Sequence, residues 1–119
     1  MNVLAIDVGG THIKILVTGQ KVHRQFVSGP QLNPGVMVAG VKNLVQDWPY
    51  DVISIGYPGP VRNNRPVAEP FNLGKGWVEF NYRAAFNSTL LKYFLPSPAH
   101  YSIVLVSLAS PGRGQADAT

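Results

Sequence analysis

The alternation of apolar and polar residues predicts strands in the first part of the chain. Residues 3–8 are apolar and rich in β-branched side chains, and residues 12–17 place apolar side chains at every second position. Gly9 and Gly10 separate the two runs. Two such runs around a Gly-Gly turn are typical of a β-hairpin. Residues 22–27 predict a third strand.

Helical spacing replaces this alternation further along. Residues 36–48 carry apolar side chains on one face of a helix, and Pro49 is expected to end it. Residues 52–55 then predict a short strand, residues 80–94 a second helix, and residues 103–108 a further strand-like run. The order of three strands, a helix and a strand indicates the α/β class.

Composition narrows the classes of protein that fit this pattern. The 119 residues suffice for one domain, and the absence of cysteine excludes a disulfide scaffold, thiol catalysis and Cys-based zinc sites. Ten basic residues against six acidic ones give a net charge of +4, but the bases are scattered, so we expect no nucleic-acid partner. The start lacks a basic leader, and residues 101–109 are too short to span a bilayer. We therefore expect a cytoplasmic protein with no membrane partner.

The first segment that could carry chemistry is the predicted hairpin turn. Asp7 ends the first strand, Gly9 and Gly10 leave the backbone bare, and Thr11 adds a hydroxyl group. Glycines let backbone N–H groups converge on an anion, and a carboxylate beside a phosphate requires Mg²⁺ or its waters in between. Taken alone, however, an ordinary hairpin with a Gly-Gly turn is the simpler interpretation.

Two later segments offer groups suited to a sugar. The Gly-Tyr-Pro-Gly-Pro turn at residues 56–60 follows a predicted buried strand and contains Gly59. Within residues 69–77, Asn72 offers the donor and acceptor that a sugar hydroxyl needs, and Trp77 offers an apolar face for the ring. The alternatives are a plain strand-to-loop turn and a surface loop whose tryptophan fills the core.

In this order, with a helix between the first two, the three segments resemble the ROK family of sugar kinases over residues 1–86. The glucokinase branch is the most similar, and the Glu-Pro-Phe-Asn-Leu-Gly-Lys-Gly-Trp stretch resembles polyphosphate glucokinases in particular. The resemblance implies an α/β fold, the N-terminal lobe of the actin-like (ribonuclease H-like) ATPase architecture. Its mixed sheet would start with an antiparallel hairpin and would be incomplete.

The resemblance also implies a phosphotransferase activity of the glucokinase type. A phosphoryl group would pass from ATP or polyphosphate, with Mg²⁺, to the 6-hydroxyl of glucose or a similar hexose. Full-length relatives would be homodimers. The phosphate-binding motif falls on Asp7, which would also contact Mg²⁺ indirectly, and on Gly9, Gly10, Thr11 and Lys14. The sugar-side loops fall on Gly59 and Asn72.

One part of the family pattern is missing. A sugar hydroxyl needs a carboxylate base, which the family supplies from an Asn-Asp pair, and this sequence has no such pair. Residues 87–119 do not resemble the family, so we interpret residues 1–86 as the lobe and the remainder as a frameshifted or disordered tail. Residues 103–108 could be either the family's next strand or an exposed apolar run. We expect a fragment that is inactive alone; the alternative is a non-catalytic sugar- or nucleotide-binding remnant.

Overall fold

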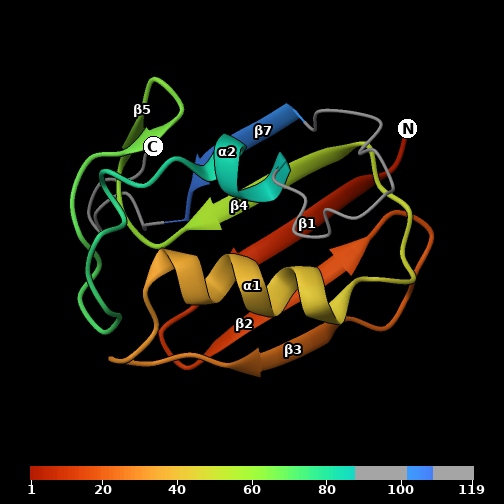
Figure 1. The fold of residues 1–119 in the computed structure, drawn as a ribbon, viewed down its shortest axis with the longest axis horizontal. Coiled ribbons are helices and arrows are strands. Elements are labelled where there is room, and N and C mark those ends of the chain that lie inside the picture. The colour runs from red at the N-terminus through yellow and green to blue at the C-terminus, as the bar shows by residue number, and fades with distance from the viewer. Residues whose placement is uncertain (88–101, 109–119) are drawn as a thin grey trace.

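A five-stranded mixed sheet organises the computed structural model, which describes residues 1–87 and 102–108. The strand order is β3-β2-β1-β4-β7, and a separate two-stranded sheet joins β5 to β6 (Figure 1). The elements are β1 (Val3–Val8), β2 (His12–Val17), β3 (Arg24–Val27), α1 (Pro34–Leu44), β4 (Val52–Tyr57), β5 (Val61–Arg62), β6 (Arg65–Pro66), α2 (Tyr82–Asn87) and β7 (Ser102–Ser107).

The sheet combines antiparallel and parallel pairing, as expected. β2 lies antiparallel to both β1 and β3, whereas β4 runs parallel to β1 and to β7. The predicted mixed α/β sheet that starts with an antiparallel hairpin is therefore confirmed. The third strand begins at Arg24 rather than at residue 22, and β4 continues to Tyr57.

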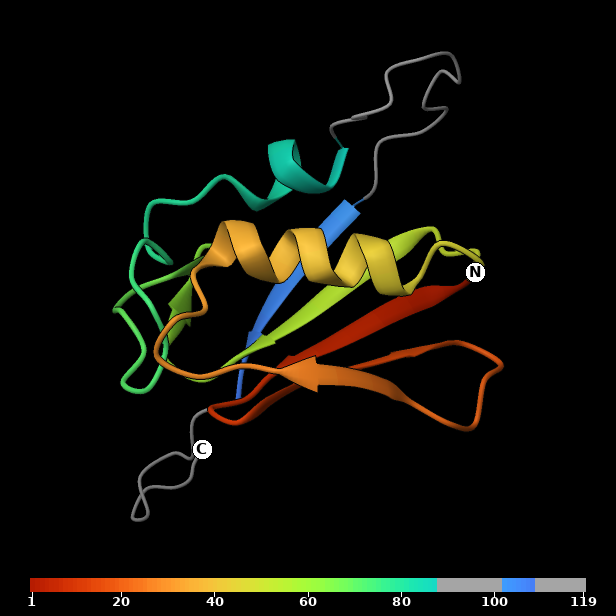
Figure 2. The same ribbon diagram turned by 60° about the horizontal axis from the view of Figure 1, so that its bottom comes forward.

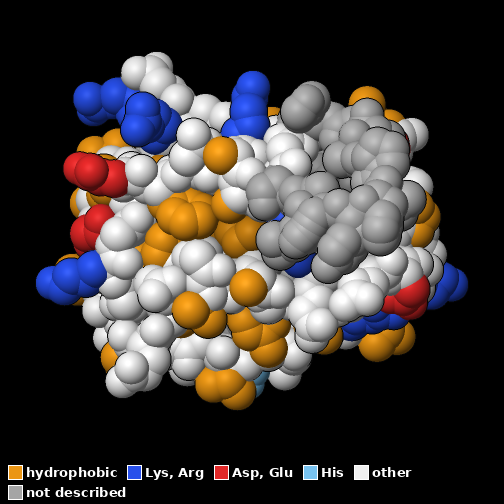
Figure 3. Space-filling model, in the orientation of Figure 1, with side chains coloured by type: hydrophobic (Ala, Val, Ile, Leu, Met, Phe, Trp, Pro, Cys, Tyr) orange, Lys and Arg blue, Asp and Glu red, His pale blue; other side chains and the backbone are white. Residues whose placement is uncertain are grey.

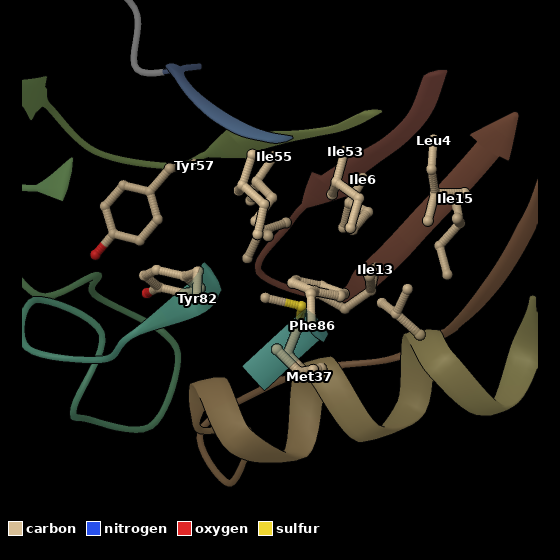
Figure 4. Packing of buried hydrophobic residues seen from close by; sticks show 14 of the residues in the cluster. Leu4, Ile6, Ile13, Ile15, Met37, Ile53, Ile55, Tyr57, Tyr82 and Phe86 are labelled. Carbon is tan, nitrogen blue, oxygen red and sulfur yellow. The ribbon is translucent and has the colours of Figure 1, made fainter. Parts of the chain in front are cut away.

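Both helices lie on one side of the sheet (Figure 2). Every second residue of β1 and β2 points towards them, and the labelled isoleucines of the sheet face Met37 and Phe86 in Figure 4. Among the described residues, no helix covers the opposite face, where Val104 and Val106 of β7 remain about half exposed. The core therefore lies in a single layer between the sheet and the helices.

Helix α1 begins with an asparagine cap and ends earlier than the sequence predicts. The Asn33 side chain accepts a hydrogen bond from Val36 N at 2.9 Å, and Pro34 opens the helix. The prediction that the helix runs to residue 48 and ends because of Pro49 is wrong. Val45 already leaves helical geometry, with φ −110° and ψ 22°.

An arginine from β3 accounts for this early end. The Arg24 guanidinium lies 3.8 Å from the centre of the Trp48 ring and donates to the Leu44 carbonyl at 2.8 Å. It also bonds both carboxylate oxygens of Asp47, at 2.7 and 3.0 Å. This hydrogen-bonded ion pair raises the pKa of Arg24 and lowers that of Asp47. The turn that follows α1 is thus held by contacts from a distant strand.

The second helix is tied to the first. Asn81 caps α2 by accepting from Ala84 N at 2.9 Å, so the helix starts later than the predicted residue 80; residues 88–94 of the prediction lie outside the described residues. Lys42 of α1 donates to the Ala85 carbonyl at 2.7 Å. Burial lowers the pKa of Lys42.

A short hairpin covers part of the β7 edge. Asn63 and Asn64 link β5 to β6 with φ angles of 52° and 62°, which are conformations that asparagine tolerates. The Asn64 side-chain amide donates to the Ile103 carbonyl at 2.8 Å and accepts from Leu105 N at 2.7 Å. The hairpin was not predicted, because residues 60–78 carry the composition of a loop.

The structure of β7 bears on the two interpretations of residues 103–108, a further strand or an exposed apolar run. Residues 102–107 form a strand parallel to β4, from Val52 beside Ser102 to Tyr57 beside Ser107. They therefore form a strand of the sheet and also expose apolar side chains on its uncovered face. The predicted division at residue 86 stays a prediction, and the tail beyond residue 108 lies outside the described residues.

Candidate functional site

The β1–β2 turn is a tightly held hairpin tip. Gly9 N donates to the His12 carbonyl at 3.0 Å, which closes the turn. Ser28 supports it from the chain that follows β3, since its N donates to the Thr11 carbonyl at 2.9 Å and its hydroxyl to the Gly9 carbonyl at 2.7 Å. Gly10 and Thr11 are exposed at the tip. The structure thus presents the predicted phosphate-binding residues on a fixed backbone.

The two glycines of the tip differ in what the fold requires. A Cβ atom on Gly9 would lie 2.8 Å from the His12 carbonyl oxygen, so only glycine fits there. A Cβ on Gly10 would have ordinary contacts at 3.8 Å, and Gly10 has no positive φ. Packing therefore explains Gly9 but leaves Gly10 without a structural requirement.

Asp7 and Lys14 lie opposite each other on β1 and β2. Both are exposed on the uncovered face of the sheet, and Asp7 also lies beside Gly56 of β4. They line a shallow hollow of about 400 Å³ whose other walls are largely apolar and include Val106 and Leu108. The strand register thus brings the predicted carboxylate and ammonium group together, two strand positions below the hairpin tip.

Asn72 lies against the hairpin tip although 62 residues separate it from Gly10 in the chain. A Cβ on Gly10 would be 3.8 Å from both Cβ and Nδ2 of Asn72. Asn72 is exposed, so its amide is open to a ligand at this junction. The predicted phosphate and sugar segments therefore meet at one end of the sheet, just beyond the C-terminal end of β1.

Glu69 fixes the loop that carries Asn72. Its carboxylate accepts hydrogen bonds from the backbone N–H groups of Gly76, Trp77 and Val78 at 2.9–3.1 Å. Gly74 N donates to the Leu32 carbonyl at 2.8 Å, which anchors the loop to the segment before α1. Glu69 is thus occupied by its own loop rather than free to act as a base.

Gly59 belongs to the turn after β4 and is buried. Its carbonyl accepts a hydrogen bond from the Ser107 hydroxyl at 2.7 Å, which ties the turn to the end of β7. Leu108 N donates to the Tyr57 carbonyl at 2.7 Å in the same place. Gly59 therefore helps to hold together the C-terminal ends of β4 and β7, and its contact with a sugar stays a prediction.

Trp77 belongs to the core rather than to an exposed sugar platform. The side chain is fully buried, with its ring 6.1 Å from the ring of Tyr57. The interpretation of Trp77 as an apolar face for a sugar is therefore wrong, and the alternative of a core-filling tryptophan is right. Burial of so large an apolar ring stabilises the loop against the sheet, although the indole N–H of Trp77 has no hydrogen-bond partner among the described residues.

The described carboxylates include no evident base at the end of β7. Ser107 and Leu108 stand there, Asp47 pairs with Arg24, and Asp51 accepts from Asn2 N at 2.8 Å. Within residues 1–87 and 102–108, no three His, Asp or Glu side chains form a metal-binding group. Mg²⁺ is often held by one or two carboxylates together with phosphate oxygens and waters, so a single exposed carboxylate such as Asp7 is compatible with it, and its contact with Mg²⁺ stays a prediction.

Ser28 and Glu69 were missed as supports of the site. Ser28 acts on Gly9, 19 residues away, whereas Glu69 acts on Trp77 and its neighbours within its own loop; neither residue type marks such a contact in the sequence. Their residue types are common in loops, so the sequence carries no signal for these roles.

Comparisons with known proteins place the fold. No protein-family model and no curated protein matches the chain. A crystal structure of a protein from Cytophaga hutchinsonii, described provisionally as a sugar kinase, matches 90% of this chain with a TM-score of 0.62 and 19% identity. The chain shares the fold of part of that protein. It spans 36% of that protein's length, and no helix of the described residues is long and apolar enough to cross a membrane.

Proposed function

We propose that the chain forms the phosphate- and sugar-binding part of a ROK-type sugar kinase of the glucokinase branch. The substrates would be glucose or a similar hexose, phosphorylated at its 6-hydroxyl, and ATP or polyphosphate as the donor. The position of Asn72 beside Gly10 carries this proposal. Phosphoryl transfer requires donor and acceptor to be held side by side, and these two residues belong to the two segments expected to hold them.

Each residue would contribute a separate interaction. Backbone N–H groups at Gly9 and Gly10 and the Thr11 hydroxyl would bind the terminal phosphate, and Lys14 would offset its charge. The Asn72 amide would orient a sugar hydroxyl towards that phosphate. Mg²⁺, positioned through its waters by Asp7, would neutralise charge on the transferred group.

The missing base limits what this chain does by itself. Without a carboxylate to accept the hydroxyl proton, we expect binding of both substrates and no measurable turnover. Ser107 and Leu108 at the end of β7 favour the second candidate, a binding module without catalysis. A coupled glucose-phosphorylation assay run beside binding measurements tests what the two candidates share, namely binding without turnover, and turnover by this chain would contradict both the missing base and the binding-module candidate.

Alanine at the two adjacent glycines gives a matched test. Gly10→Ala should keep the fold but weaken binding of Mg-ATP or tripolyphosphate about ten-fold, since the methyl group prevents close approach to the backbone. Gly9→Ala should disturb the hairpin itself, because its Cβ would collide with the His12 carbonyl. Isothermal titration calorimetry and amide NMR spectra would measure both effects.

Asn72→Ala distinguishes sugar binding from phosphate binding. It should weaken glucose binding and leave phosphate binding within about two-fold, because the proposed role of the lost amide is to bind the sugar. Unchanged phosphate binding in Gly10→Ala would contradict the proposal, and so would an absence of binding of both donors and glucose by the wild-type chain.

A further inference from the structure

A second cavity of about 470 Å³ lies away from the hairpin tip. The β5–β6 hairpin, the start of α2 and strand β7 line it, and none of the predicted phosphate or sugar residues does. Its volume falls within the range of small-molecule sites. Its lining therefore decides which kind of ligand would fit.

The floor of this cavity is largely apolar. Ile103 and Leu105 contribute from the helix-covered side of β7. Phe80 and Tyr82 add two rings that meet edge to face, with centroids 4.9 Å apart and planes at 64°. The Tyr82 hydroxyl already donates to the Trp77 carbonyl at 2.7 Å, so the floor offers mainly apolar contact.

The rim is predominantly basic. Arg65 reaches the cavity from the β5–β6 hairpin and Arg83 from α2, against the single carboxylate of Glu79. Figure 3 shows Lys and Arg side chains over the hairpin and α2. The Asn64 amide, which bonds two backbone groups of β7, fixes the hairpin that carries Arg65. Two guanidinium groups at one mouth can pair with the oxygens of a phosphate or carboxylate.

We propose that this cavity binds a small phosphate monoester that carries an aromatic ring. The ring would lie on the Phe80, Ile103 and Leu105 floor, and the phosphate would accept hydrogen bonds from Arg65 and Arg83. The site is separate from the hairpin tip and does not depend on the proposed kinase function.

Phenyl phosphate is the probe, titrated into the whole chain by calorimetry at low salt. We expect saturable binding, with inorganic phosphate and phenol each binding at least ten-fold more weakly because each lacks one half of the interaction. Arg65→Gln and Arg83→Gln should each weaken binding about five-fold or more. Amide NMR shifts should centre on residues 79–83 and 103–105 rather than on the hairpin tip.

Two further variants serve as controls on charge. Arg62→Gln removes a base from the same hairpin outside the cavity lining and should leave affinity within two-fold, whereas Glu79→Gln removes the opposing carboxylate and should strengthen binding. An equal loss in Arg62→Gln would overturn the proposal in favour of unspecific attraction. Lack of saturation, or unchanged affinity in both Arg65→Gln and Arg83→Gln, would also overturn it.

Discussion

A single carboxylate, Glu69, shapes the loop that presents Asn72. It accepts hydrogen bonds from three consecutive backbone N–H groups, those of Gly76, Trp77 and Val78. Charge-assisted hydrogen bonds of this kind are stronger than neutral ones. The position of Asn72 therefore depends on a residue that makes no direct contact with the expected sugar.

Glu69→Ala should lower the free energy of unfolding by about 1–2 kcal/mol, because three backbone donors lose their partner. It should also weaken glucose binding, since the loop is no longer fixed. Urea denaturation and calorimetry would measure the two effects. Glu79→Ala, which removes a carboxylate from the same stretch of chain, is the control and should leave glucose binding unchanged.

The residue types at the candidate site could be predicted, but their surroundings could not. Glycines, a hydroxyl and a carboxylate around one turn suit phosphate binding, but an ordinary hairpin turn explains them equally well, so the phosphate role stays a prediction. Whether Trp77 faces a ligand or the core depends on the Tyr57 ring and the sheet beneath it, which lie elsewhere in the chain. The residues next to Trp77 in the sequence therefore do not predict whether its side chain is buried.

At the scale of elements, α1 begins at Pro34, two residues before the predicted residue 36, and ends where its tertiary contacts require. Asn33 followed by Pro34 is a recognisable start. At the other end, Val41, Val45 and Trp48 continue the helical spacing, so the apolar pattern alone predicts four further residues of helix. Arg24 of β3 supplies the contact that favours a turn there, and the sequence gives no sign that this residue lies nearby.

The cap at the start of α1 can be tested directly. Asn33→Ala should destabilise the protein by about 1 kcal/mol, since Val36 N loses its acceptor. Asn33→Asp should retain stability, because a carboxylate accepts the same bond and suits the positive end of the helix dipole. Thermal and urea unfolding would compare the two, and equal losses in both variants would show that the side-chain acceptor is unimportant.

At the scale of the whole molecule, two buried tyrosines connect the 66–78 loops to the sheet and helices. The Tyr57 hydroxyl donates to the Ala68 carbonyl at 2.6 Å, and that of Tyr82 donates to the Trp77 carbonyl. Burial, with a smaller contribution from Glu69, raises the pKa of Tyr57 from 10.0 to about 12. Burial raises the pKa of Tyr82 as well.

These raised pKa values predict a loss of stability in alkali. Below pH 10 both hydroxyls are protonated in the folded and unfolded chains, so stability is complete. Between pH 10 and about pH 12 the unfolded chain releases protons that folded Tyr57 retains, which costs about 2–3 kcal/mol. Urea unfolding at several pH values would measure the decline. Tyr57→Phe should be less stable at neutral pH but should decline less steeply, and an identical slope would contradict this assignment.

Asn64 has a consequence for how the chain behaves beside other chains. Its amide imitates a neighbouring strand by bonding a carbonyl and the N–H group two residues further along β7. An unpaired strand edge is a template on which foreign strands can add, and aggregation commonly starts there. One side chain on a two-residue turn thus caps part of the sheet edge and keeps its outermost strand from recruiting another.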